Sequence, residues 1–502
     1  TDLTYWEEDP EAAVKALNTC YTYLGNMDEQ LYCEAMTDNA YTKQPNDATQ
    51  NIGNGSYSTA DPYVKKVWDG RYTGIRMCNE LLENIDRVPD LDPELKKRYI
   101  GEAKVLRAYN YYELYTKFGD VPYTTKVLSI KESMSIARTA KATVIANVLA
   151  DLDEVINGNY LPTSYDADNK GRITRWAAMA IKAKIYLFEG NWTQVKNITS
   201  TIMTEGGFKL FGSYAGLFEI ANEYNSEVIL DAQYRPTSRE HQMMYVFLPP
   251  TLGGYSQLSP LQELVDSYIM LDGKTIKETG TSFDESHPYA NRDPRLKATV
   301  MYTGNSYTLA DGTEVVINCE KGEGKDGYGV GSDCSATGYY IKKYWDNTYR
   351  ATLYSGLNPI LIRYADILLM NAEALAELGE LDKTAWDATI KPIRDRAGFT
   401  LASALEFPEG ASKDKLIEIV RNERRSELAL EGHRHKDIIR WRIADNVLNG
   451  WCHGLKTNDV VGTDDGYVRV ENRTFNANKH YLWPIPQAER DLNGNLEQNP
   501  NW

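Results

Sequence analysis

Two stretches of the chain, residues 176–205 and 362–395, repeat one helix–turn–helix pattern, and this repeat is the strongest constraint on the fold. In each stretch, apolar residues step by three or four along a first helix, a glycine follows, and a second helical pattern begins. When the two segments are aligned in sequence at Gly190 and Gly379, residues of the apolar helix faces correspond: Trp176 to Ala365, Ala180 to Leu369, and Ala183 to Ala372. The chain therefore contains at least two units of the same kind.

Small residues on the first helix of each unit let the second helix approach closely, and the glycine can adopt the positive φ that ends the first helix. Both features are typical of tetratricopeptide hairpins. Residues 99–115 form a weaker unit of this kind, and a further helix is predicted at 64–86. We predict a mainly α fold on a tetratricopeptide-like scaffold of stacked helical hairpins.

The middle of the chain differs from its two ends. Twelve glycines lie between Gly253 and Gly338. Alternating residues separated by glycine-containing turns predict a β-meander there, with strands at 298–303, 306–310 and 313–318. Long loops in a folded protein usually carry function, so this region is the predicted ligand-binding part. We divide one predicted domain, 1–502, into a helical part at 1–205, a loop-rich insert with short strands at 206–360, and a helical part with an extended tail at 361–502.

Charge and hydropathy exclude several kinds of partner. The 55 Lys and Arg residues stand against 71 Asp and Glu residues, which gives a formal net charge of −16. Such a charge disfavours nucleic acid or an anionic bilayer as the main partner. No apolar run reaches the roughly 18–20 residues of a membrane-spanning helix. The sequence therefore indicates a folded globular protein without a predicted membrane span.

One segment has the residue types of an acid–base site. Glu423, Glu427 and Glu431 recur every four residues on one face of a predicted helix, where two carboxylates could transfer protons or bind a metal. The alternative is a buried ion network with arginines of neighbouring helices, such as Arg363. We favour the ion network, because the segment is rich in arginine and a stacked helical face rarely forms a cleft.

The remaining sequence lacks the motifs of a nucleophile, a phosphate loop or a zinc site. We therefore predict no enzyme activity, no cofactor and no metal. The six cysteines contain no C-x-x-C pair. Cys319 and Cys334 flank a glycine-rich loop and could form a disulfide in an oxidising compartment, and two free thiols are the alternative.

Tyrosine is the positive signal for a ligand. The chain has 35 Tyr but only 10 Phe and 10 Trp, and rings with a hydroxyl suit wet surfaces on which the C–H face of a sugar can stack. Segment 344–349 joins rings to hydrogen-bonding groups, and its candidate ligand residues are Trp345, Asp346, Asn347 and Tyr349. Further candidates are Tyr41, Tyr57, Tyr63, Tyr255 and Tyr289. A Trp345 that anchors its own loop is the alternative.

Several longer strings resemble the SusD/RagB family. They follow one another in family order along nearly the whole chain: VWDGRYTGIRMCN at 67–79, GEAKVLRAY at 101–109 with FGDVP at 118–122, NRDPRL at 291–296, IRYADILL at 362–369, ERRSELALEG at 423–432 with DIIRW at 437–441, and YLWPIP at 481–486 with QNP at 498–500. The family keeps these strings as scaffold and varies the loops that contact ligand. The resemblance therefore identifies the fold and not the ligand.

The resemblance implies a lipoprotein at the cell surface, in the outer membrane of a Gram-negative bacterium. Such proteins lie over a TonB-dependent barrel of the SusC type and capture nutrients, most often oligosaccharides, without a reaction of their own. We therefore expect an oligosaccharide ligand, a SusC-like partner and a lipid anchor upstream of Thr1. Two alternatives stay open, namely capture of peptides by the same fold and glycoside hydrolysis by Glu423 and Glu427.

Overall fold

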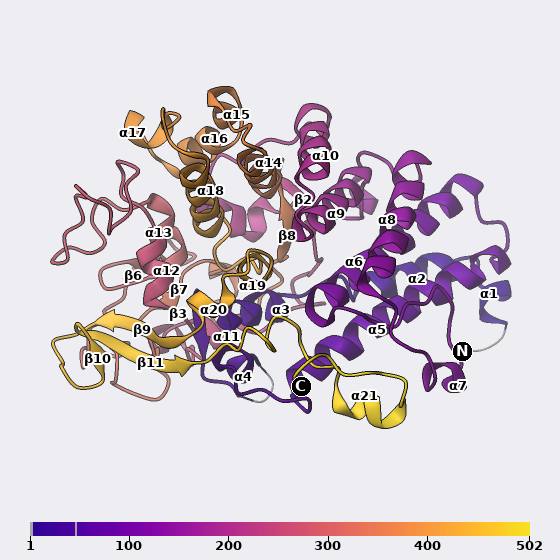
Figure 1. Ribbon diagram of the computed structural model, residues 1–502, viewed down its shortest axis with the longest axis horizontal. Coiled ribbons are helices and arrows are strands. Elements are labelled where there is room, and N and C mark those ends of the chain that lie inside the picture. Colours follow the sequence, from indigo (N-terminus) through magenta and orange to yellow (C-terminus); the bar gives the residue numbers. More distant parts are fainter. Residues whose placement is uncertain (1–3, 46–47) are drawn as a thin grey trace. The chain divides into compact units, whose positions relative to one another are not determined.

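The computed structural model describes residues 4–45 and 48–502, without the side chain of Tyr349, and divides into two compact units (Figure 1). The first unit consists of Thr1–Gly25, Tyr57–Gly190 and Asn476–Trp502, and the second of Asn26–Ser56 and Asn191–Phe475. The predicted fold class, mainly α with a loop-rich and partly β region, is confirmed. The predicted boundaries at 205 and 360 stay a prediction. Among the described residues, no helix is both long and apolar enough to cross a bilayer.

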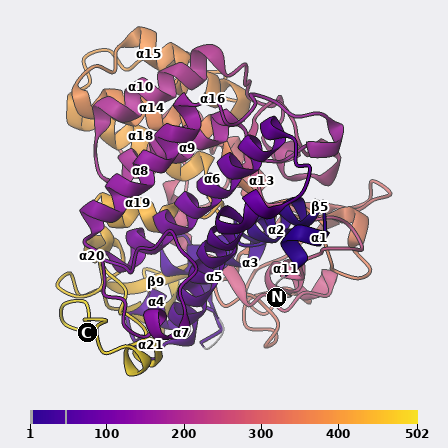
Figure 2. The ribbon, with the colours of Figure 1, turned by 90° about the vertical axis from the view of Figure 1, so that its right-hand side faces the viewer.

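Long helices packed side by side form the first unit (Figures 1 and 2). Helix α5 (Pro62–Asn84) packs on α6 (Pro93–Phe118), α6 packs on α8 (Lys141–Asn157), and α8 packs on α9 (Arg175–Phe188). The shorter helices of this unit are α1 (Tyr5–Glu8), α2 (Ala12–Tyr21), α7 (Ile130–Ser133) and α21 (Gln487–Leu492), with 3-10 turns at Ile85–Arg87 and Ala167–Asn169.

Local sequence explains where the two longest helices begin and how closely they pack. Asp61 and Asp92 each accept hydrogen bonds from backbone N–H groups of the first turn that follows, and a proline occupies the first helical position after each. Gly74 lies in α5 where a Cβ atom would be 2.8 Å from Cβ of Tyr23 and 2.9 Å from Nδ2 of Asn110. The contact between α5 and its neighbours therefore requires a residue without a side chain.

Three helices from distant parts of the chain stack in the second unit (Figure 2). Helix α10 (Trp192–Glu205) packs on α14 (Tyr364–Leu378), and α14 packs on α18 (Lys413–Glu427). Helix α14 ends at Gly379 with a φ of 73°, the positive value that the sequence predicts there. The other helices are α3 (Met27–Tyr32), α4 (Gln50–Asn54), α11 (Met243–Phe247), α12 (Gln262–Ser267), α13 (Pro294–Thr299), α15 (Lys383–Ala388), α16 (Ile390–Ala397), α17 (Ala402–Leu405), α19 (Arg434–Arg440) and α20 (Ala444–Val447), with 3-10 turns at Cys33–Met36, Ala215–Phe218, Ile220–Asn222, Pro250–Leu252 and Asn347–Tyr349.

Short antiparallel strands connect the loops of the second unit. The pairs are β1 (Ala40–Thr42) with β3 (Leu258–Pro260), β2 (Val228–Asp231) with β8 (Ile360–Arg363), β4 (Val300–Met301) with β7 (Tyr340–Ile341), and β5 (Ser306–Thr308) with β6 (Glu314–Val316). In a three-stranded sheet, β11 (Tyr467–Arg473) lies between β10 (Thr463–Asp464) and β9 (Gly450–Lys456). The tight turn at Asp465-Gly466 has positive φ at both residues, 50° and 86°, as a two-residue hairpin turn requires.

The predicted β-meander is only partly present. Its second and third strands form the β5–β6 hairpin, but its first segment begins as the end of α13 and then pairs with β7 as β4. The reason lies in Asn305, whose side-chain amide donates to the carbonyl groups of Lys297 and Val300. These bonds turn the chain between β4 and β5, so the two strands do not pair with each other.

Candidate functional site

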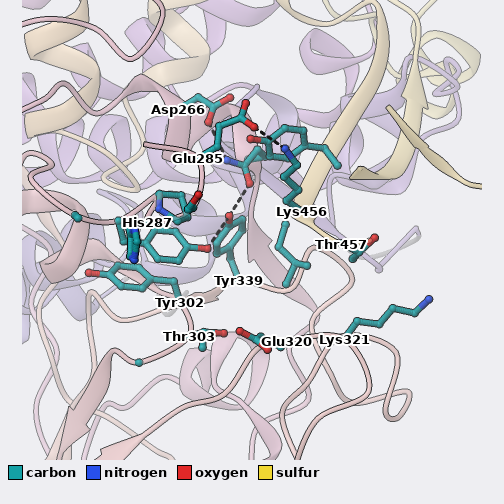
Figure 3. Close-up of a pocket in the computed structure, with 18 of the residues that line it drawn as sticks. Asp266, Glu285, His287, Tyr302, Thr303, Glu320, Lys321, Tyr339, Lys456 and Thr457 are labelled. Carbon is teal, nitrogen blue, oxygen red and sulfur yellow. Dashed lines mark hydrogen bonds and ion pairs between the residues drawn. The ribbon is translucent and has the colours of Figure 1, made fainter. Parts of the chain in front are cut away.

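The second unit contains a pocket of about 1140 Å³ (Figure 3). Its lining comes from six segments of the chain: α12, residues 283–292, residues 302–304, residues 320–323, Tyr339, and the β9–β11 sheet with the loop that follows β9. Pockets for small molecules usually measure about 300–1,000 Å³. This one is large enough for a ligand that extends beyond a single ring.

Three tyrosines form one wall of the pocket. The rings of Tyr289 and Tyr302 stack with their centroids 4.1 Å apart and their planes inclined by 18°. The hydroxyl groups of Tyr289 and Tyr339 lie 3.2 Å apart, and buried Tyr339 donates to Oε1 of Gln262 at 2.5 Å. These hydrogen bonds fix the orientation of the stack, so the half-buried Tyr302 presents a rigid aromatic surface.

The polar lining carries more negative than positive charge. Its carboxylates are Asp266, Glu285, Glu320, Glu323 and Asp459, and its permanent cations are Arg292, Lys321 and Lys456. Burial raises the pKa of Asp266, although the amide of Gln262 donates to its carboxylate at 2.8 Å. The pocket therefore combines an aromatic wall with many hydrogen-bond acceptors.

His453 joins two walls of the pocket. Its Nδ1 atom lies 2.7 Å from Oε1 of Glu263 on α12, and its Nε2 atom lies 2.8 Å from Oδ2 of Asp464 on β10. The hydrogen bond to Glu263, together with the one to Asp464, raises the pKa of His453 to about 9. The imidazole is therefore a cation at neutral pH and holds strand β9 against α12.

Of the predicted ligand residues, the structure places Tyr289 in this pocket. Tyr255 lies elsewhere in the second unit, where its ring stacks on Tyr245 at 5.8 Å with an interplanar angle of 15°. Tyr354 meets Tyr245 edge-on at 6.5 Å. Because Tyr255 and Tyr354 are 48% and 38% exposed, these rings form a separate aromatic surface.

The segment at 344–349 is held against strand β5 by its own side chains. Nε1 of Trp345 donates to the carbonyl of Thr308 at 2.8 Å, and the amide of Asn347 donates to the same carbonyl at 3.4 Å. Asp346 is buried and accepts a hydrogen bond from Oγ of Ser355 at 2.6 Å. This burial corrects the prediction that Asp346 orients a ligand, because its carboxylate stabilises the loop instead. The predicted Tyr349 side chain lies outside the described part of the structure.

Tyr57 and Tyr63 also differ from prediction, because both are buried in the first unit. The Tyr57 ring lies 4.7 Å from that of Trp502, and the Tyr63 ring lies 6.4 Å from that of Trp483. Neither ring offers a free face to a sugar. Tyr41 lies on β1 in the second unit, half-buried, and its hydroxyl accepts a hydrogen bond from Gln50 at 3.0 Å.

Glu423 and Glu427 are buried among arginines of the second unit. Glu427 contacts Arg363 at 2.7 Å and Arg295 at 2.8 Å, and Glu423 contacts Arg394 at 2.8 Å. Burial alone would raise the pKa of both carboxyl groups, but the neighbouring guanidinium groups outweigh it and hold each pKa below its usual value. Both are therefore ionised, and neither lines the pocket.

The structure also bears on the disulfide that was considered from the sequence. Cys319 and Cys334 are buried free thiols, so this disulfide is not formed. Over the ranges 4–45 and 48–502, no group of three or more His, Cys, Asp or Glu is arranged to hold a metal ion.

Sequence reasoning missed most of the pocket lining, including Tyr302, Asp266 and Lys456. One signal was available, since the turn residues Asp465-Gly466 are followed by the alternating run YVRVEN at 467–472. That pattern is typical of a β-hairpin and would have placed a sheet in the C-terminal part.

Comparison with known proteins gives consistent matches over most of the chain. A family model described as the SusD family matches residues 217–502, and one described as starch-binding associating with outer membrane matches residues 12–187. SusD-like protein P25 of Formosa agariphila is 28% identical over 494 residues, which cover 88% of each chain.

Solved structures show the same likeness. A SusD-like carbohydrate binding protein from Bacteroides fragilis is 28% identical with a TM-score of 0.87, and the match covers 98% of this chain and 100% of that chain. A laminarin binding SusD-like protein is 24% identical with a TM-score of 0.73, and the match covers 98% and 99% of the two chains. At that identity the second likeness concerns the fold alone.

Proposed function

Because this chain belongs to the SusD family, we propose that it binds glycans in the pocket of the second unit and has no reaction of its own. The observation that carries this proposal is the stacked pair of Tyr289 and Tyr302 inside a polar pocket. A sugar ring has an apolar C–H face that stacks on an aromatic ring, while its hydroxyl groups need acceptors and donors around the edge. Similarity to a SusD-like carbohydrate binding protein supports the proposal.

In this proposal, Tyr302 provides the stacking face, and Asp266, Thr303 and Glu320 bond to sugar hydroxyl groups. Each stacked ring contributes on the order of 1–2 kcal/mol after desolvation, so two or three bound rings contribute about 2–6 kcal/mol, which corresponds to dissociation constants of roughly tens of millimolar to tens of micromolar. Such affinity allows the captured glycan to be released. We further propose release to a SusC-like TonB-dependent barrel in the outer membrane, at the cell surface, with the protein held there by an N-terminal lipid anchor. The description of one matching family model as associating with outer membrane supports this location.

The ion pairs that Glu423 and Glu427 form with arginines support binding without hydrolysis. A glycoside hydrolase needs a carboxylic acid that carries a proton next to the scissile bond. Both glutamates are ionised by neighbouring arginines and lie outside the pocket lining. They therefore have neither the proton nor the position that hydrolysis would require.

Affinity measurements with a panel of soluble glycans and short peptides test the proposal. We expect glycans to bind without release of new reducing ends, and Tyr302→Ala to weaken binding about tenfold, as the loss of one stacked ring implies. Tyr255→Ala is the matched control, because Tyr255 is another stacked tyrosine of this unit outside the pocket. Binding of peptides but not glycans would refute the proposal. Loss of glycan binding in Tyr255→Ala alone would move the site to the Tyr245–Tyr255 surface.

A further inference from the structure

The three permanent cations in the described pocket lining are all engaged by groups of the protein itself. The ammonium group of Lys456 lies 2.8 Å from Oε2 of Glu285, and that of Lys321 pairs with Asp459. The guanidinium group of Arg292 is buried and donates only to backbone carbonyl groups, those of Val265, Tyr268 and Pro288. Each of these positive groups therefore already has a partner in the protein, and an incoming anion would have to compete with that partner.

The histidine at the edge of the pocket is engaged as well. Nδ1 of His287 lies 2.9 Å from a carboxylate oxygen of Asp284, and both side chains are exposed. A proton on His287 would therefore be matched by a carboxylate of its own loop. This pair does not add an available positive charge to the lining.

Two lining carboxylates remain without a counter-ion. Glu320 and Glu323 are both exposed in the segment 320–323, and no cation of the described residues pairs with either. The carboxylate of Asp266 accepts a hydrogen bond from the amide of Gln262, and the charges of Lys277 and Arg292 also act on it. With five carboxylates against three cations, the described lining has a net negative charge.

Resting on the proposed function, we infer that this pocket selects uncharged oligosaccharides and rejects glycans that carry sulfate or carboxylate groups. Proteins recognise such anions through free arginine or lysine groups, which form short charge-assisted hydrogen bonds. Here an anionic substituent would instead approach Glu320 and Glu323 and be repelled. The hydroxyl groups of a neutral sugar can donate to the same carboxylates, so the charge that rejects anions also suits neutral rings.

Parallel titrations with neutral and anionic glycans test this selectivity. The neutral probes are laminarin, starch and galactomannan, and the anionic probes are alginate, polygalacturonate and carrageenan, all with EDTA so that no divalent cation bridges two carboxylates. We expect at least one neutral probe to bind, and every anionic probe to bind on the order of tenfold or more weakly at low ionic strength. Added salt should narrow this difference by screening the repulsion.

Releasing the two lysines from their carboxylate partners should reduce the selectivity. The double variant Glu285→Gln/Asp459→Asn removes the partners of Lys456 and Lys321, and we expect affinity for anionic probes to rise several-fold. The matched control is Asp387→Asn/Glu418→Gln, which removes two carboxylates that pair with exposed lysines outside the pocket. It changes the net charge of the protein by the same amount, and we expect no gain.

Each outcome decides between the two proposals. If the unmodified protein binds an anionic probe as tightly as any neutral one, the selectivity is refuted and glycan binding stands. An equal gain in the control variant also refutes it, because the effect would then come from net charge and not from the pocket. If no probe binds, glycan capture and selectivity fall together.

Discussion

Replacing Glu427 by alanine should destabilise the second unit by about 3 kcal/mol, because it unbalances a buried ion network. Within the described residues, this network links five carboxylates to five cations: Glu227, Asp293, Glu423, Glu427 and Glu431 with Arg295, Arg363, Arg394, Arg396 and Lys343. Removal of one carboxylate leaves one buried positive charge unmatched.

The expected loss of stability depends on the ion pairs that each arginine keeps in the variant. Breaking a buried pair usually costs about 3–5 kcal/mol. Glu427 contacts Arg295, Arg363 and Arg396, and each of these retains another carboxylate in the network. We therefore expect the lower end of that range. The low pKa of Glu427 has the same origin, so its contribution to stability is present above the pKa of an unfolded glutamate and is lost as the pH falls toward the folded value.

Urea unfolding followed by tryptophan fluorescence measures this effect, because the guanidinium group of Arg394 lies 5.4 Å from the ring of Trp386. Glu418→Ala on the same helix is the control, since the Glu418 side chain is 63% exposed and its loss should change stability by less than about 0.5 kcal/mol. Equal stability of the two variants would refute the reasoning. A stable Glu427→Ala protein that had lost a measurable release of reducing ends would instead establish hydrolysis.

Two further predictions concern the loop at 344–349 and the β9–β11 sheet. Trp345→Ala should lower the free energy of unfolding by about 1–3 kcal/mol, because the variant loses the hydrogen bond to Thr308 and the packing on Tyr307. Its glycan affinity should be unchanged. Weaker glycan binding in a fully stable variant would place the binding site on that loop. Protonated His453 should stabilise the sheet fully below pH 6.5 and progressively less as the pH rises through about 9. In His453→Gln, the free energy of unfolding measured with urea should no longer depend on pH in this way. An unaltered pH dependence would contradict the prediction.

Much of the helical architecture could be predicted because its signals are local. The glycine after the stripe of α14 marks the end of that helix, and Asp61 and Asp92 mark the starts of α5 and α6 within one turn. The β-meander was harder, because Asn305 redirects the first strand through hydrogen bonds that a pattern of alternating residues does not contain. Such contacts decide which strands pair with one another more than they decide which residues form strands.

The aromatic site could not be predicted from residue type, because burial decides which ring is available. Tyr57, Tyr63 and Tyr289 all lie in segments rich in polar or turn-forming residues. The first two are covered by Trp502 and Trp483, which come from the far end of the chain, whereas Tyr289 stacks beside an open pocket. A single sequence does not show which distant aromatic residue will cover a given tyrosine.

A single sequence also does not show which charged groups a ligand can reach, so the net charge of the chain does not by itself predict the charge of the pocket. A formal charge of −16 argues against polyanionic partners in general, but one free lysine in a pocket would be enough to bind a sulfate or a carboxylate locally. The partner of Lys321 is 138 residues away in the sequence, and the partner of Lys456 is 171 residues away. Folding therefore decides which cations a ligand can reach. In this pocket folding pairs both lysines with carboxylates, so the rejection of anionic glycans depends on tertiary structure and not on composition.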